Sequence, residues 1–188
     1  MASLCLYFQV HQPFRLRKYT IFDVGKKHDY FDEHRNKEIC QKVARKCYLP
    51  ANELILKLIN KLQGQFRLTY SISGTALDQF AKYAPDVIKS FQRLARTGCV
   101  EFLSETYNHS LAFQYSKEEF KAQVDKHKQK IKELFNYEPK VFRNTELIYN
   151  NELAQLVEQM GYKAVLSEGV DHILGWRSPN FVYKPKGT

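Results

Sequence analysis

Short apolar runs alternate with amphipathic stretches along this chain, and this alternation restricts the fold more than any other feature. The runs are rich in β-branched and aromatic residues and are bounded by turn residues, as buried strands are. They cover residues 4–10, 66–72, 99–103, 141–143 and 163–167. Stretches with helical periodicity cover residues 50–62, 75–83, 85–96, 116–135 and 151–160. The sequence therefore predicts an α/β protein in which strands and helices alternate.

Strands joined by helices run parallel, with right-handed crossovers, so either an open doubly wound sheet or a β/α barrel is expected. The sequence contains neither G-x-G-x-x-G nor G-x-x-x-x-G-K-[ST], and the first predicted strand ends in His11-Gln12-Pro13 rather than in glycines. A nucleotide-binding sheet is therefore disfavoured, and we predict a parallel β/α barrel. Residues 12–48 show no clean periodicity and are predicted to form an irregular connection.

The net charge of +9 comes from 29 Lys and Arg against 20 Asp and Glu. Residues 12–48 hold ten of the basic and five of the acidic residues, which is +5 of the total. Such mixed charge is typical of a solvated surface segment, and we favour this over nucleic-acid binding. No apolar run approaches the roughly 20 residues of a membrane span, so no membrane partner is predicted.

The four cysteines stand at positions 5, 40, 47 and 99 and form no C-x-x-C pair. The first five residues carry neither the basic segment nor the apolar stretch of a secretory signal. A disulfide framework and a zinc knuckle are therefore disfavoured, and we expect reduced thiols and a cytoplasmic location.

Polar residues follow four of the five predicted strands. His11 and Gln12 follow the first strand, and residues 104–109, 144–146 and 168–172 follow the third, fourth and fifth. In a parallel β/α fold all these positions lie at the carboxyl ends of the strands, where active sites are built. We therefore expect their His, Glu and Asp side chains to share one site.

Some of these residues also have an explanation without function. His11 would then cap the end of the first strand, and Glu146 would cap the helix that follows it. Glu105 would pair with His109, which lies four residues later.

The same holds for other polar and aromatic candidates. Glu101 lies within a predicted strand and would face solvent or pair with an Arg. Asp171 and His172 would be ordinary loop residues, and Trp176, the single Trp, would pack a loop instead of stacking on a sugar ring.

Carboxylates beside His and aromatic residues in one polar site suit the cleavage of a glycosidic bond. One carboxylate attacks or stabilises the sugar cation, and another protonates the leaving oxygen. The attacking carboxylate must be ionised, and Arg143 would favour the ionised form of Glu146 if their side chains meet. The 12 Tyr and 13 Phe would supply apolar surfaces for sugar faces, although most of them are expected in the core.

Zinc-dependent hydrolysis is the rival chemistry, with His11, His109, Asp171 and His172 as ligands. Polysaccharide deacetylases bind zinc in this way on a related scaffold, with two closely spaced His on one segment. Here the nearest such pair is formed by His28 and His34, in the irregular basic segment. We therefore predict no metal site and no cofactor, and metal analysis after chelation separates the two alternatives.

Three motifs together resemble glycoside hydrolase family 57, in its α-amylase-like branch. They are His11-Gln12-Pro13, then Gly98 with Glu101 three residues later in a stretch that continues to Ser110, and Phe142-Arg143-Asn144-Thr145-Glu146-Leu147-Ile148-Tyr149. The resemblance implies a (β/α)7 barrel and a retaining α-glucan hydrolase that acts on starch, glycogen or maltooligosaccharides, with Glu146 as the nucleophile. We expect substrate to be bound by His11, Gln12, Glu101, Glu105, His109, Arg143, Asp171 and Trp176.

One part of the family pattern has no match. The general-acid Asp of the family comes from a later strand, and nothing after residue 172 fits its motif. A β/α barrel also needs more than 188 residues, because about 250 is typical of an eight-stranded one. We therefore expect residues 1–188 to form the amino-terminal portion of a single catalytic domain, with the acid beyond Thr188 and the rest of the domain as a partner. By itself this chain would be inactive.

Alternative functions remain open at this point. A 4-α-glucanotransferase of the same family would use the same nucleophile, and a sugar instead of water would then intercept the glycosyl-enzyme. A zinc-dependent carbohydrate deacetylase and a non-enzymatic binding module belong to different classes. Steep salt dependence of nucleic-acid binding would favour the module.

Overall fold

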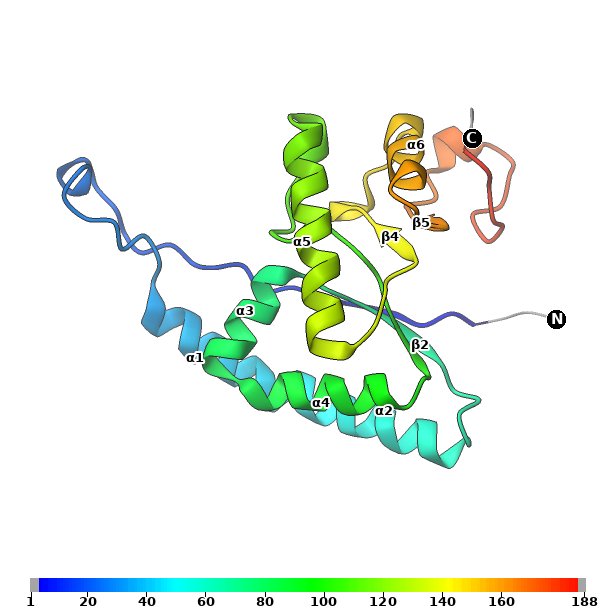
Figure 1. Ribbon diagram of the computed structural model, residues 1–188, viewed down its shortest axis with the longest axis horizontal. Helices are drawn as coiled ribbons and strands as arrows, with labels where there is room; N and C mark the ends of the chain where they lie inside the picture. The colour runs from blue at the N-terminus through cyan, green and yellow to red at the C-terminus, as the bar shows by residue number, and fades with distance from the viewer. Residues whose placement is uncertain (1–3, 186–188) are drawn as a thin grey trace.

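The computed structural model describes residues 4–185 (Figure 1). Residues 1–3, which belong to the five residues used for the expectation about a secretory signal, and Thr188 lie outside this range. The described residues form parallel strands in chain order, at β1 (Tyr7–Val10), β2 (Leu68–Ile72), β3 (Val100–Phe102), β4 (Val141–Arg143) and β5 (Ala164–Leu166). The predicted α/β class with parallel strands is confirmed.

The strands pair with their neighbours in the sequence. One sheet has the order β1-β2-β3, the other pairs β4 with β5, and a parallel bridge between Ser104 and Phe142 joins the two. This sequential order differs from that of a doubly wound sheet, which reverses at its switch point. Within residues 4–185 the strands do not close into a barrel.

The predicted helices are present with small changes at their ends. They are α2 (Leu49–Lys61), α3 (Gly74–Tyr83), α4 (Pro85–Arg96), α5 (Lys117–Phe135) and α6 (Asn151–Gln159), and a short α7 (Asp171–Leu174) follows β5. Side-chain oxygens of Ser73, Ser116 and Asn150 accept hydrogen bonds from the backbone N–H of the third residue of α3, α5 and α6, respectively. These caps fix where each helix begins after its strand or loop.

The prediction of an irregular connection over residues 12–48 is wrong in its second half. Helix α1 (Glu33–Val43) continues through a π-helical turn (Ala44–Tyr48) directly into α2. Residues buried along this rod include Asn36, Cys40 and Ala44. They are spaced by four residues and include an Asn, so they lack the usual 3,4 alternation of an apolar helical stripe.

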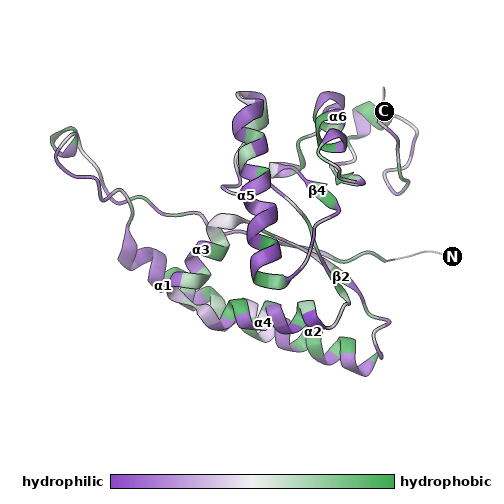
Figure 2. Ribbon diagram, viewed as in Figure 1, coloured by the Kyte–Doolittle hydropathy of each residue, from purple (hydrophilic) through white to green (hydrophobic). Residues whose placement is uncertain are grey.

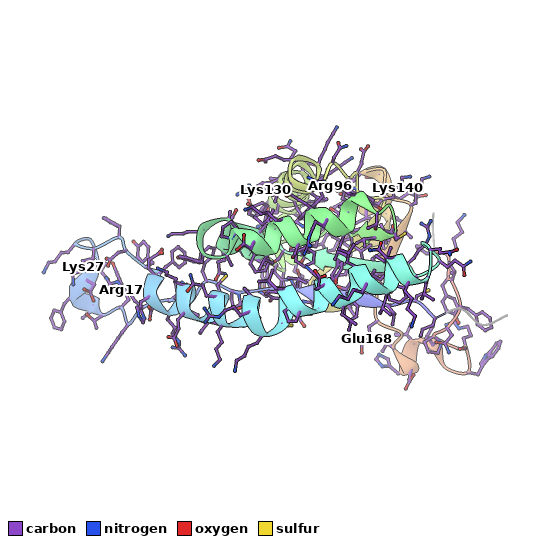
Figure 3. All side chains as sticks on the ribbon, turned by 90° about the horizontal axis from the view of Figure 1, so that it is seen from below. Arg17, Lys27, Arg96, Lys130, Lys140 and Glu168 are labelled. Carbon is purple, nitrogen blue, oxygen red and sulfur yellow. The ribbon has the colours of Figure 1, made fainter. Side chains whose placement is uncertain are left out.

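Residues 14–31, which we call the arm, project from the body of the molecule (Figure 1). An antiparallel bridge between Leu16 and Phe31 closes its base, and a 3-10 turn (Ile21–Asp23) forms its tip. Arg17 and Lys27 both pair with Asp23 in the arm, and Figure 3 shows them at one end of the molecule, beyond the start of α1. Part of the positive charge of residues 12–48 is therefore located on this projection.

The larger hydrophobic core lies between β1–β3 and helices α1–α4, and the carboxyl-terminal half of α5 packs into it through Ile131 and Phe135. Figure 2 shows hydrophobic residues on β2 and β4 and their alternation with hydrophilic residues along α2 and α4. At the centre Phe102 is fully buried and stacks on Phe135, with ring centroids 4.6 Å apart. A smaller core lies under α5 and α6 and contains Phe120, Phe142 and Leu153.

Of the cysteines, all of which are free thiols, Cys40 and Cys99 are buried. Within residues 4–185 no helix has the length and apolar character needed to cross a membrane.

Candidate functional site

Side chains from different strands meet at the carboxyl ends of β1–β4. Four of the predicted site residues lie together there: His11 follows β1, Glu105 and His109 follow β3, and Glu146 follows β4. Because neighbouring parallel strands end at the same edge of a sheet, residues far apart in sequence come into contact. His109 links the group, since it contacts each of the other three.

Glu105 is the buried anion of the site, with its side chain 1% exposed. The Ser71 hydroxyl donates a hydrogen bond to its Oε1, and Oε2 lies 3.0 Å from Nδ1 of His109. Burial alone would raise the pKa of Glu105, but the His109 hydrogen bond and the nearby His127 outweigh it and lower the pKa. The expected pairing of Glu105 with His109 is present, within a larger network.

His109 lies between two carboxylates. Its Nδ1 faces Glu105, and its Nε2 lies 3.2 Å from Oε1 of Glu146. The hydrogen bond to Glu105 raises the pKa of His109 against the opposing effect of burial. The backbone of His109 has a φ of 53°, in the left-handed region that residues other than glycine adopt only rarely.

His11 packs flat against His109, with ring centroids 4.1 Å apart. Its Nδ1 lies 2.7 Å from Oγ of Ser73, the N-cap residue of α3. Burial, followed by the positive charge of His109, lowers the pKa of His11 to about 4. The pKa values of the two stacked rings are therefore shifted in opposite directions, that of His109 upward and that of His11 downward.

We expect the His11 ring to stay neutral until the pH falls to about 4. Because the unfolded chain takes up this proton near pH 6.5, His11 lowers the free energy of unfolding as pH falls from about 6.5 to about 4. An NMR titration of the ring resonances measures the midpoint, and His11→Gln identifies the resonance. A midpoint above pH 6 would contradict the assigned environment.

Glu146 projects outward from a strained turn. Its side chain is 70% exposed, and its backbone φ is 53°, followed by 58° at Leu147. Two successive non-Gly residues in the left-handed region cost energy, and such strain is concentrated at functional sites. The alternative that Glu146 caps the following helix is wrong, because Asn150 caps α6.

Arg143 does not meet Glu146, so the condition under which it would favour the ionised form of Glu146 is not fulfilled. Its Nη2 donates to Oε1 of Gln9 at 2.9 Å, and its Nη1 lies 3.9 Å from Oε2 of Glu105. Among the described residues Arg143 forms no ion pair with Glu146. The side chain is 2% exposed, and its Nε and Nη1 have no hydrogen-bond partner within residues 4–185. Arg143 therefore points into the fold, toward the buried carboxylate.

The other predicted site residues lie apart from this cluster. Gln12 donates to the hydroxyl of Tyr48 and accepts from Arg15. Glu101 pairs in register with Thr69 and lines a surface hollow of about 380 Å³ at the amino ends of the strands. Its position within the strand, before the carboxyl end, accounts for this separation from Glu146.

Asp171 and Trp176 also lie outside the contacts of the cluster. Asp171 begins α7, where it is exposed, and Trp176 is 95% exposed. The alternative that Trp176 packs a loop is wrong, because its side chain is exposed among the described residues.

Sequence reasoning missed Gln9, Ser71, Ser73 and His127, all of which contact the cluster. Ser71 and Ser73 are two residues apart, so strand alternation gives them a common face, which was the available signal. His127 lies on α5 between Gln123 and Ile131 at four-residue spacing, and all three are buried. Its Nε2 lies 2.8 Å from the carbonyl oxygen of Ile72.

The proposed zinc ligands do not form a metal-binding group. Within residues 4–185 no set of three or more His, Cys, Asp or Glu is arranged to hold a metal ion. His28 contacts Tyr30 in the arm, and His34 lies on α1, so this pair is not part of the cluster around His109.

Known proteins resemble the chain over most of its length. A candidate alpha-amylase of Methanocaldococcus jannaschii is 46% identical over 180 residues, which are 94% of this chain and 38% of that protein. The fold is similar to 4-alpha-glucanotransferase of Thermococcus litoralis, with a TM-score of 0.70 and 18% identity over 93% of this chain and 23% of that one. It is also similar to the alpha-amylase AmyC of Thermotoga maritima, with a TM-score of 0.59 and 14% identity over 86% and 38%.

The chain thus spans less than two fifths of the length of each of these relatives. Glycosyl hydrolase family 57 matches residues 5–188, a range that includes every residue of the cluster. On this match and on the similarity to the archaeal relative, the chain belongs to glycosyl hydrolase family 57.

Proposed function

We propose that this chain forms the amino-terminal part of a retaining α-glucan hydrolase of the α-amylase type, with Glu146 as its nucleophile. One observation carries the proposal: Glu146 is a solvent-accessible carboxylate that is held at 3.2 Å by His109 of a buried network, at the carboxyl ends of the strands. The substrate class is starch, glycogen or maltooligosaccharides. Family membership and the alpha-amylase name of the archaeal relative support this choice.

In the proposed reaction Glu146 attacks the anomeric carbon while the bond to the leaving oxygen breaks. A second carboxyl group donates a proton to that oxygen, and a glycosyl ester forms on Glu146. Water then attacks the anomeric carbon, gives its proton to the second carboxylate and frees Glu146. His109, when protonated, places positive charge beside the nucleophile and orients its carboxylate before the attack.

Net retention of configuration is the test of this mechanism in the intact enzyme. We expect the first product released from a maltooligosaccharide to be the α-anomer, because two inversions at one carbon restore its configuration. Proton NMR of the first minutes of reaction measures the anomer before mutarotation. An initial β-anomer would contradict a covalent role for Glu146. Longer oligosaccharides formed without new reducing ends would identify the enzyme as a 4-α-glucanotransferase instead.

The general acid of this mechanism is proposed to lie in a part of the catalytic domain outside these 188 residues. A retaining pair must stand about 5–5.5 Å apart. Glu105 is buried and paired with His109, while Glu168 and Asp171 are exposed on the segment after β5. None of these carboxylates contacts Glu146 within residues 4–185.

We therefore expect the 188-residue chain alone to show no Glu146-dependent hydrolysis of maltooligosaccharides. The measurement is a steady-state assay of the purified chain beside its Glu146→Gln variant. Turnover that disappears in the variant would place the second carboxyl group inside this chain.

A further inference from the structure

Nε2 of His109 has two polar neighbours that it cannot satisfy in the same protonation state. Oε1 of Glu146 lies at 3.2 Å and Nε2 of Gln9 at 3.4 Å. The orientation of the Gln9 amide is set from its other end, because its Oε1 accepts a hydrogen bond from Arg143. The NH₂ group of Gln9 therefore faces His109. Nε2 can donate to Glu146 or accept from Gln9, but not both.

The other ring nitrogen of His109, Nδ1, is hydrogen-bonded to Glu105. Nδ1 lies 3.0 Å from a carboxylate whose side chain is 1% exposed, so Nδ1 carries its proton in the cation and in the neutral ring. The proton that His109 gains or loses as the pH changes is therefore the one on Nε2. In the cation Nε2–H donates to Glu146. In the neutral ring the Nε2 lone pair accepts from Gln9 and faces the lone pairs of Glu146.

We propose that His109 is a positioning residue that holds the Glu146 carboxylate when protonated and releases it to bind Gln9 when neutral, with Glu105 fixing the ring. This inference depends on the proposed role of Glu146 as nucleophile. It adds His109 as a residue that acts on the reaction through Glu146. It also predicts that the protonation of His109 sets the basic limit of the pH range in which the enzyme is active.

The charges around His109 favour the protonated ring, which is the form that holds Glu146. Glu105 in the same segment and Glu146 after β4 are both carboxylates that contact the ring. Arg143 of β4 opposes the cation, but it is shared with Gln9 and with Glu105. His11 from the β1 side is neutral above about pH 4 and adds no charge near neutral pH. The raised pKa of His109 agrees with this balance, and Glu146 is released as pH rises through that pKa.

In the intact enzyme, two substitutions should move the basic limb of the pH profile of kcat/KM in opposite directions. In Glu105→Gln the buried anion is lost, so the basic limb of kcat/KM should move down by about one pH unit or more. In Gln9→Glu a carboxylate is added beside Nε2, so the basic limb should move up. Glu158→Gln removes an exposed carboxylate on α6 and should leave the limb in place.

The pH profile separates positioning from a purely structural role. A residue that only supports the fold would lower kcat/KM at every pH without moving the limb. Should Glu105→Gln fail to fold because buried Arg143 loses its anion, Gln9→Glu still tests the proposal by its upward shift. A basic limb that stays fixed in Gln9→Glu, or that moves down, would overturn it.

NMR titration of the His109 ring separates this proposal from that of the nucleophile. We expect the midpoint of His109 to fall in both Glu105→Gln and Glu146→Gln, since each loses an anion in contact with the ring. His109→Gln identifies the resonance. If Glu146→Gln retains turnover while its His109 midpoint falls, the nucleophile is wrong and the contact is right. If turnover is lost but the midpoint is unchanged, His109 does not hold Glu146.

Discussion

Replacement of Glu146 by Gln should lower the kcat of the intact enzyme on soluble starch by about 10⁶-fold, by analogy with the loss of other covalent nucleophiles. The amide cannot form the glycosyl ester, yet it keeps the size and the backbone of the native residue. Because the side chain is 70% exposed, the substitution leaves no buried cavity. The free energy of unfolding should therefore change by no more than about 0.5 kcal/mol.

The matched control is Glu158→Gln, which removes a carboxylate from an exposed position on α6. Its kcat should equal that of the wild type. Measurement of initial rates of reducing-end release, together with circular dichroism of both variants, distinguishes loss of chemistry from loss of fold. Near-normal turnover in Glu146→Gln would show that another group is the nucleophile.

Phe102→Ala should cost about 3–5 kcal/mol of unfolding free energy, which is a large part of the stability of a typical domain. Phe102 is fully buried on β3, and its ring contacts those of Phe135, Tyr70 and Tyr137. Truncation leaves a cavity between the sheet and the helices that these rings cannot fill by small movements.

Phe22→Ala is the control for the same chemical change at an exposed site. Phe22 lies at the tip of the arm and is 80% exposed, so its truncation should change stability by less than about 0.5 kcal/mol. Urea unfolding followed by fluorescence gives both values. Equal destabilisation by the two substitutions would contradict the assignment of Phe102 to the core.

Regular elements with one buried face could be predicted closely from the sequence. The predicted ranges 85–96 and 141–143 coincide with α4 and β4. The bounds of α4 were predictable because Pro85 starts the helix and Gly98 follows its end. The first strand is shorter than predicted, since Leu4 at its start is 86% exposed and pairs with no neighbouring strand. Apolar composition alone does not reveal which residues find a partner.

The site was predictable where it depends on topology and not where it depends on side-chain direction. That His11, Glu105, His109 and Glu146 lie together follows from the position of each after a parallel strand. That Arg143 turns to Glu105 does not follow, because nearness in sequence to Glu146 says nothing about the face of β4 that it occupies. Gln9 was missed for a similar reason, since it lies inside a strand and not after it.

The π-helical turn over Ala44–Tyr48 lets this part of the chain hold one residue more than a regular α-helix would. Each residue of an α-helix turns the chain by about 100°. Positions spaced by four drift around a regular helix, and the wider turn offsets that drift, so that Asn36 and Cys40 share a buried side with Asn52. Pro50 lies just after the turn and has no N–H to give to the carbonyl of Lys46, which favours the irregularity. Loss of one residue from this turn would restore a regular α-helix, because eleven residues of an α-helix turn the chain by only about 20° beyond three full turns. Cys40 would then stay beside the carbonyl of Gln79, and Asn36 would keep its hydrogen bonds to Arg15 at the base of the arm. Loss of one residue between Asn36 and Cys40 would instead rotate Asn36 by about 100° away from Arg15. Among relatives, a one-residue gap is therefore expected within the turn and not in the helices on either side of it.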